Sequence, residues 1–258
     1  MKLNDLNGKE WIIHTKSWFV LRGKSRTKEV INHPAKFPEE LAERFITFFT
    51  KKGEIVFDPF MGVGSTGVAS NKINRKSYGI EINNDFCNVS NKRIGSDCVV
   101  NGDSRYEKNY KIKNVDFIIT SPPYWNMLKK KRGHSYSQHQ QREVKNLKLY
   151  YSDNKNDLGN IENYNDFLKE LAKVFKHCYL ILKKSKYMVV VIQNFRNNDG
   201  KYITLAWDLV KIIEKSGFIF EGEQIWCQDD KQLGIWGYPS TFISNIHHHY
   251  CLVFKKNA

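Results

Sequence analysis

The sequence predicts a doubly wound α/β fold whose mostly parallel sheet has seven strands, in one domain spanning residues 1–258. Short apolar runs that end beside an acidic residue alternate with helix-like segments, and this alternation is typical of parallel sheets with right-handed crossovers. The length of 258 residues and a hydrophobic content of 41% suit a single domain of this kind. Neither an internal repeat nor a linker to a second domain is evident.

The first half of the chain supplies four strands. Residues 53–70, GEIVFDPFMGVGSTGVAS, give an apolar strand, a glycine-bearing turn and small residues suited to the start of a helix. The next strand, 76–81, precedes Asn83 and Asn84, either of which can cap the following helix. Strands at 97–103 and 115–120 complete this half.

The second half continues the alternation. Apolar residues recur at steps of three and four over 163–183, which predicts an amphipathic helix, and the run 187–193 reads as a buried strand. A second amphipathic helix, 204–217, closes at Gly217. Two last strands follow at 218–227 and 250–256.

A basic insertion from Lys129 to Asn160 breaks this pattern, because it is polar and lacks sustained periodicity. A loop of that length inside a compact domain is usually functional or disordered. The chain carries 41 Lys and Arg against 27 Asp and Glu, a net charge of +14. This excess favours a polyanionic partner such as nucleic acid, with solubility or lysine-rich codon usage as the alternative explanation.

Other patterns argue against membranes, export and metals. No run approaches the ~20 apolar residues of a membrane span, and the start of the chain lacks a secretory signal, so we expect a cytoplasmic protein. Five scattered cysteines without a CxxC pair indicate free thiols and no metal site. The triplet 247–249, HHH, precedes a strand whose residues alternate faces, which favours structural or DNA-facing histidines over metal ligands.

The turn DPFMGVGST (58–66) brings backbone close to a ligand. It is not the phosphate loop GxxxxGK[ST], because no lysine follows the glycines. Gly62, Gly64 and Gly67 match GxGxxG, which is a weak signal alone.

Three acids follow three successive strands: Asp58, Glu81 and Asp103. Parallel strands place such residues at one carboxyl edge, where open α/β sheets bind ligands. Glu81 follows Asp58 at close to the ~20-residue offset of a ribose-binding carboxylate. Helix capping is the alternative role for these acids.

Five segments together carry a resemblance: HPAKFPEEL (33–41), DPFMGVGST, YGIE (78–81), NGDS (101–104) and TSPPYW (120–125). They resemble the amino-methylating DNA methyltransferases, Rossmann-like enzymes that use S-adenosylmethionine to modify N4 of cytosine or N6 of adenine. The resemblance covers most of the chain. Its cofactor motifs precede the catalytic motif, whereas many members with SPPY have the opposite order.

The resemblance implies a role for each matching residue. The cofactor-binding set is His33, Ala35, Phe37, Asp58, Pro59, Phe60, Gly62, Gly64, Ser65, Thr66, Glu81, Ile82, Asp103 and Ser104. The catalytic set is Ser121, Pro122, Pro123 and Tyr124. The DNA-binding set is Trp125, Lys129, Lys130, Lys131, Arg132 and Arg142. The Ser121 hydroxyl and the Pro122 carbonyl would accept the protons of the base amine, and Tyr124 would stack on a flipped base.

Serine at position 121 resembles members that modify cytosine N4, and adenine N6 remains the alternative. Methylation of carbon 5 of cytosine normally uses a Pro-Cys pair, and no proline here precedes a cysteine; the deaminase pattern HxE with PCxxC is also absent. The expected partners are double-stranded DNA and, where one exists, a cognate restriction endonuclease. Methylation of RNA or protein, or DNA binding by a catalytically dead module, are the competing hypotheses.

Overall fold

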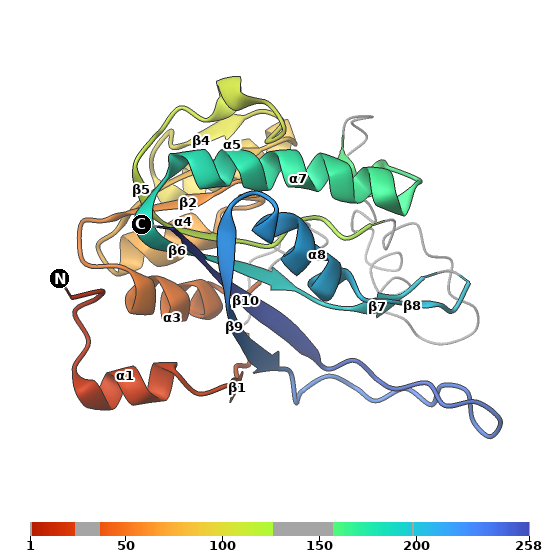
Figure 1. Cartoon of the computed structure of the whole chain (residues 1–258). Coiled ribbons are helices and arrows are strands. Elements are labelled where there is room, and N and C mark those ends of the chain that lie inside the picture. The colour runs from red at the N-terminus through yellow and green to blue at the C-terminus, as the bar shows by residue number, and fades with distance from the viewer. Residues whose placement is uncertain (1, 24–36, 126–156, 198, 258) are drawn as a thin grey trace.

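The computed structural model describes residues 2–23, 37–125, 157–197 and 199–257 (Figure 1). The strands are β1 (Trp18–Val20), β2 (Ile55–Asp58), β3 (Lys76–Glu81), β4 (Val99–Asn101), β5 (Val115–Thr120), β6 (Leu182–Ile192), β7 (Phe195–Arg196), β8 (Tyr202–Ile203), β9 (Phe218–Cys227) and β10 (His248–Lys256). The helices are α1 (Gly8–His14), α3 (Glu39–Phe49), α4 (Ser65–Lys72), α5 (Asn84–Ile94), α7 (Tyr164–Ile181) and α8 (Leu205–Glu214), with 3₁₀ turns η1 (Glu107–Asn109) and η2 (Leu158–Asn160).

The central sheet has the order β1-β9-β10-β6-β5-β2-β3-β4, and β7 pairs with β8 in a separate ribbon. All neighbours from β4 to β6 are parallel, and β1 is parallel to β9. β10 is antiparallel to both β6 and β9. The predicted α/β fold with a mostly parallel sheet is therefore confirmed.

All seven predicted strands are present, and β1 adds an eighth at the edge of the sheet. β1 has three residues, which is too short for a periodic signal in the sequence. β6 begins at Leu182, earlier than the predicted start at 187, because α7 runs directly into it. The polar start of β6 has a partner: Nζ of Lys183 and Lys186 lie 2.7 and 3.5 Å from the buried Asp116 carboxylate.

Asparagine side chains cap three of the described helices, α1 at Asn7, α5 at Asn83 and α7 at Asn163. The Asn83 side chain accepts hydrogen bonds from the N–H groups of Asp85 and Phe86 at the start of α5. Asn163 caps α7 in the same way. These caps satisfy N–H groups that have no partner within the helix, so the chain turns into a helix at a defined residue.

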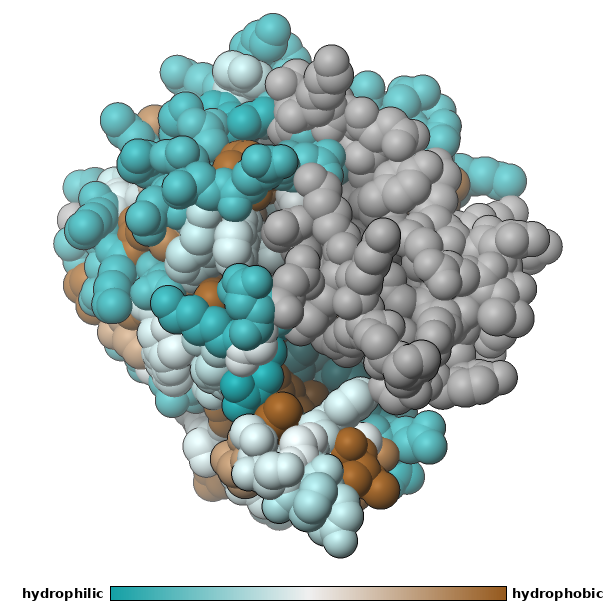
Figure 2. Space-filling view, turned by 90° about the vertical axis from the view of Figure 1, so that its right-hand side faces the viewer, coloured by the Kyte–Doolittle hydropathy of each residue, from teal (hydrophilic) through white to brown (hydrophobic). Residues whose placement is uncertain are grey.

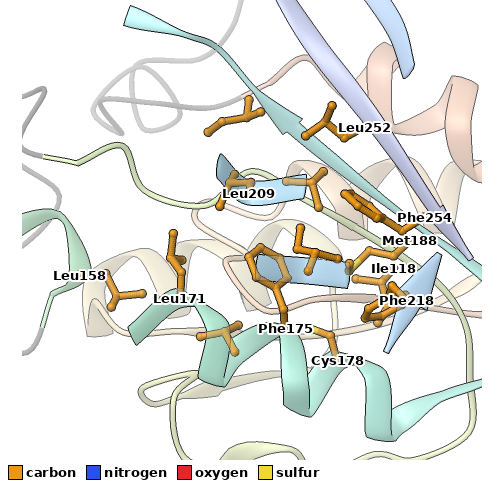
Figure 3. Packing of buried hydrophobic residues seen from close by; sticks show 14 of the residues in the cluster. Ile118, Leu158, Leu171, Phe175, Cys178, Met188, Leu209, Phe218, Leu252 and Phe254 are labelled. Atoms are coloured by element: carbon orange, nitrogen blue, oxygen red, sulfur yellow. The ribbon is translucent and has the colours of Figure 1, made fainter. Parts of the chain in front are cut away.

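Two apolar clusters cover opposite faces of the sheet. On one face α7 and α8 pack against residues that include Ile118 and Met188, with Phe175 of α7 at the centre (Figure 3). On the other face α3 packs against Phe117 and Val189. Because Phe117 and Ile118 are consecutive in β5, their side chains point to opposite faces and the strand is buried on both sides. Within the described residues, no helix combines the length and apolarity that crossing a membrane requires.

We expect Phe175→Ala to lower the free energy of unfolding by about 3–5 kcal/mol, because it opens a cavity at a fully buried position. Leu180→Ala, at an exposed position on the same helix, should change it by less than about 1 kcal/mol. Urea unfolding followed by circular dichroism measures both. Equal losses in the two variants would contradict this packing of α7.

Candidate active site

A hollow opens at the carboxyl edge of β2, β3 and β5. Its empty volume is about 850 Å³ with the open mouth included. Its lining comprises Phe37, Asp58, Pro59, Phe60, Met61, Gly62, Val63, Ser65, Ile80, Glu81, Ile82, Phe86, Asp103, Ser104, Ser121, Pro122, Pro123, Asp157 and Leu158. The predicted cofactor motifs and the predicted catalytic motif therefore share one hollow, at the edge where α/β sheets bind ligands.

The glycine turn occupies residues 59–64 between β2 and α4. Gly62 and Gly64 have φ angles of 56° and 86°, in the left-handed region that favours glycine. A Cβ on Gly64 would lie 2.5 Å from Oγ of Ser90 on α5. Gly62 lines the hollow, whereas Gly64, predicted to bind the cofactor, faces α5 and allows α4 to begin close against it.

The carboxylate of Asp58, 1% exposed, joins the glycine turn to the Ser121-Pro122-Pro123 corner. Oδ1 accepts hydrogen bonds from the Phe60 N–H at 2.9 Å and from the Thr120 hydroxyl at 2.6 Å. Oδ2 accepts one from the Thr66 hydroxyl at 2.7 Å. Thr66 lies in the first turn of α4, outside the lining of the hollow, and Thr120 directly precedes Ser121. One buried side chain therefore sets the distance between the two motifs.

Glu81, at the end of β3, holds the turn from the other side. Its Oε2 accepts the Gly62 N–H at 2.8 Å, and its Oε1 accepts the Asn83 N–H at 2.8 Å. Burial raises the pKa of Glu81 to about 7 and the pKa of Asp58 to about 6, although the hydrogen bonds that each accepts act in the opposite direction. A ligand that donates hydrogen bonds or carries positive charge would stabilise the ionised forms.

The third acid, Asp103, is held by an ion pair. Nε and Nη2 of Arg105 lie 3.0 and 2.6 Å from the Asp103 Oδ2 atom, and Nη1 lies 3.1 Å from Glu170 of α7. The adjacent Ser104 hydroxyl donates a hydrogen bond to the Pro59 carbonyl. Arg105 was not among the predicted residues, because a basic residue two positions after an acid has no distinctive signal in a lysine-rich chain.

The corner after β5 places Ser121, Pro122 and Pro123 in the hollow. The ring of Tyr124 is 5% exposed, lies outside this lining, and packs edge-on against Phe195 with centroids 6.2 Å apart. Trp125 donates from Nε1 to the Glu162 carbonyl at 3.2 Å and also lies outside the lining. The structure thus brings three of the four predicted catalytic residues to the hollow.

Several predicted residues lie outside the described part of the chain: His33, Ala35, Lys129, Lys130, Lys131, Arg132 and Arg142. Of the N-terminal segment 33–41, predicted to bind the cofactor, residues 37–41 are described, and Phe37 lines the hollow. The predicted roles of all these residues stay predictions.

The hollow also contains residues that sequence reasoning missed, among them Phe86 and Asp157. Phe86 could have been found, because it stands in the first turn of a helix that starts at the carboxyl edge. Asp157 is 4% exposed, and its Oδ1 accepts the Gly159 N–H at 2.9 Å. It lies near the end of the basic insertion and ends no strand, so its approach to the hollow had no signal in the sequence.

His248 and His249 of the histidine triplet begin β10, and His247 directly precedes it. His249 stacks on Trp226 with ring centroids 4.8 Å apart, and His248 meets Tyr250 edge-on at 5.0 Å. Burial lowers the pKa of His249 to about 3, so this imidazole is neutral at pH 7. In the part of the chain that is described, no group of three or more His, Cys, Asp or Glu residues is arranged to hold a metal ion.

A family model described as DNA methylase, that of the N6 and N4 methyltransferases, matches residues 6–92 and 115–258. The match covers most of the chain, so the chain belongs to this family of S-adenosyl-L-methionine-dependent DNA methyltransferases, and the resemblance read from the sequence is confirmed.

Individual relatives match over shorter stretches. The orphan methyltransferase M.BamHII of Bacillus amyloliquefaciens is 36% identical over 111 residues, 42% of this chain and 41% of its own. The DNA adenine methyltransferase YhdJ of Escherichia coli is 36% identical over 77 residues, 30% of this chain and 26% of its own. The chain thus spans less than half the length of these curated relatives. A DNA modification methylase of Thermus thermophilus, solved with S-adenosyl-L-methionine, is 22% identical with a TM-score of 0.40, covering 61% of this chain and 54% of its own.

The raised pKa of Glu81 predicts a pH dependence of stability. The folded pKa of about 7 exceeds the ordinary value, so the folded chain binds more protons than the unfolded chain at intermediate pH. The free energy of unfolding should therefore fall as pH rises from about 5 to about 8, by an amount on the order of 2 kcal/mol from this group. Urea titrations at several pH values should show that Glu81→Gln removes this part of the decline. Glu221→Gln, at an exposed position of β9, is the control, and an equal slope in wild type and Glu81→Gln would refute the assignment.

Proposed function

We propose that the chain methylates the exocyclic amine of a base in double-stranded DNA, with N4 of cytosine as the target and S-adenosyl-L-methionine as the methyl donor. The observation that carries the proposal is the Asp58 carboxylate, which binds Thr66 behind the glycine turn and Thr120 beside the Ser-Pro-Pro corner. This link holds a ligand pocket and an amine-binding corner in one hollow. Membership of the DNA methylase family supports the same function.

The hollow suits the chemical groups of the cofactor. S-adenosyl-L-methionine supplies an electrophilic methyl group on a sulfonium. We propose that the buried Glu81 carboxylate accepts hydrogen bonds from the ribose hydroxyls and that Asp103 lies beside the adenine. Phe37 and Phe60 provide apolar walls. The pKa of Glu81, raised by burial, supports a ligand that donates hydrogen bonds to this carboxylate.

The corner supplies acceptors for the amine. The lone pair of an exocyclic amine is delocalised into the base ring, so the nitrogen is a poor nucleophile. We propose that the Ser121 hydroxyl and the Pro122 carbonyl accept its two N–H groups and favour the tetrahedral nitrogen that attacks the methyl group. The rings of Pro122 and Pro123 fix φ at about −65°, so the Pro122 carbonyl is held in place before the base arrives.

A base reaches the hollow only after leaving the duplex stack. We propose that Tyr124 stacks on this base, which requires its ring to leave the buried position against Phe195 when DNA binds. The choice of cytosine rests on Ser121, which resembles the enzymes that modify N4. A second candidate is adenine N6, which the name of the Escherichia coli relative favours.

The basic insertion, residues 129–160, is proposed to bind DNA within the single methyltransferase domain. Lys129, Lys130, Lys131, Arg132 and Arg142 would contact phosphates, with Trp125 at the near end of the segment. A cognate restriction endonuclease is a further proposed partner, because several relatives are named type II methyltransferases.

The first test uses unmethylated plasmid DNA and isotope-labelled S-adenosyl-L-methionine, followed by digestion to nucleosides and mass identification. We expect the label in N4-methylcytosine, a loss of rate on the order of a hundredfold in Ser121→Ala, and no loss in Ser96→Ala, an exposed control. Label in N6-methyladenine would assign the second candidate. No label in DNA, with the cofactor bound, would reject the proposed function and direct the search to RNA or protein.

The insertion has a separate test. Changing Lys129, Lys130, Lys131 and Arg132 to alanine should weaken duplex binding and reduce the slope of log K against log[NaCl] by about 0.9 for each phosphate that the variant no longer neutralises. Filter binding measures both. The control changes Lys184 and Lys215, at the opposite edge of the sheet, to alanine. An unchanged affinity and slope in the quadruple variant would remove the insertion from the DNA interface.

A further inference from the structure

A long arm, residues 228–247, connects β9 to β10 and projects from the body of the protein (Figure 1). The strand register fixes its position: Cys227 of β9 pairs with His248, Tyr250 pairs with Ile192 of β6, and Val190 of β6 pairs with Thr120. The arm therefore leaves the same edge of the sheet on which Ser121 follows Thr120.

The arm exposes large apolar side chains. Ile235 and Phe242 are each 87% exposed, and the exposed fractions of Leu233 and Tyr238 are 70% and 83%. Figure 2 looks onto the side from which the arm projects, and in the lower part of that view a few hydrophobic residues, in brown, lie among paler ones. Isolated exposed apolar residues are common, but a group of them on one projecting segment marks an interaction site.

Hydrogen bonds within the arm join its outgoing and returning halves. The Asn245 side chain accepts the Gly234 N–H at 2.9 Å and the Trp236 indole N–H at 3.0 Å, and it donates to the Gly234 carbonyl at 3.0 Å. The Gly237 carbonyl accepts the N–H groups of Ser240 and Thr241. A Cβ on Gly237 would lie 2.0 Å from the Thr241 carbonyl oxygen, so this turn requires glycine. The hydrogen bonds within the arm thus fix the backbone that carries the exposed apolar side chains.

The charge of the arm decides what it can bind. Residues 232–246 contain no Asp, Glu, Lys or Arg, in a chain whose net charge is +14. Phosphates are bound mainly by cationic side chains, so this tip is unsuited to the DNA backbone. Apolar side chains do suit base edges, the thymine methyl group and the space that opens when a stack is disturbed.

We propose that the apolar tip of the arm, with Ile235 and Phe242 foremost, contacts DNA bases beside the flipped target. The proposal rests on the proposed function, because it takes duplex DNA as the substrate. The position of the arm favours DNA over a second copy of the chain. A protein bound to the arm would block the edge of the sheet through which the base must enter. DNA bound at that edge would instead contact the arm directly.

The test is the affinity of Ile235→Ser/Phe242→Ser for fluorescent, sheared, unmethylated plasmid DNA, measured by anisotropy over a range of NaCl concentrations. We expect a loss of affinity on the order of tenfold or more, with the salt slope and the affinity for S-adenosyl-L-methionine unchanged. The conservative variant Ile235→Val/Phe242→Leu should retain most of the affinity. The matched control is Ile12→Ser/Ile13→Ser, which changes two exposed apolar residues on α1.

An affinity of the double serine variant within about twofold of wild type would overturn the proposal, and so would a reduced salt slope, which indicates phosphate contacts. If sedimentation velocity showed the variant dissociating a dimer while DNA affinity stayed the same, the arm would be a protein interface. Binding does not depend on methyl transfer. A wild-type chain that incorporates no label would therefore reject the proposed function, while the affinities would still decide the role of the arm.

Discussion

The buried carboxylate of Asp58 is the interaction on which the geometry of the hollow depends. It ends β2, the strand beside β5, and its two oxygens bind one hydroxyl on α4 and one on the last residue of β5. An ionised carboxylate in this position is costly without partners, and its three hydrogen bonds offset part of that cost. Two segments far apart in the sequence are thereby held at a fixed separation.

The other two acids show how the same position at a strand end serves different purposes. Glu81 binds backbone N–H groups, which fixes the glycine turn and leaves a buried carboxylate with a raised pKa facing the hollow. Asp103 binds a guanidinium that also reaches α7. The hollow therefore combines a carboxylate held by backbone amides at Glu81 with an ion-paired one at Asp103, and this difference suits a ligand with chemically distinct ends.

We assign DNA binding to two segments of opposite character, the basic insertion and the arm. The basic insertion carries the charge that phosphates require, and the tip of the arm, residues 232–246, carries apolar side chains and no Asp, Glu, Lys or Arg. In this division the insertion would supply the part of the affinity that depends on salt, and the arm would supply contacts that depend on the base sequence. It also gives a physical reason for a neutral tip on a chain with a net charge of +14, since further cations there would strengthen binding to any sequence.

The alternation of strands and helices, the seven main strands and a helix cap at Asn83 or Asn84 could be predicted from the sequence, because periodicity and turn chemistry are local properties. The two motifs that meet in the hollow were found by their resemblance to a family, and the structure selected Asn83 as the cap. Strand β1 and the first residues of β6 were not predicted from the sequence, because a three-residue edge strand and a lysine-rich start of a strand give little periodic signal. Three features became visible in the folded chain alone: Thr66 and Gly64 support the hollow from behind, Arg105 pairs with Asp103, and Asp157 lines the wall. Those outcomes depend on which distant segments the sheet brings together, and side-chain contacts across such distances leave no pattern in the order of residues.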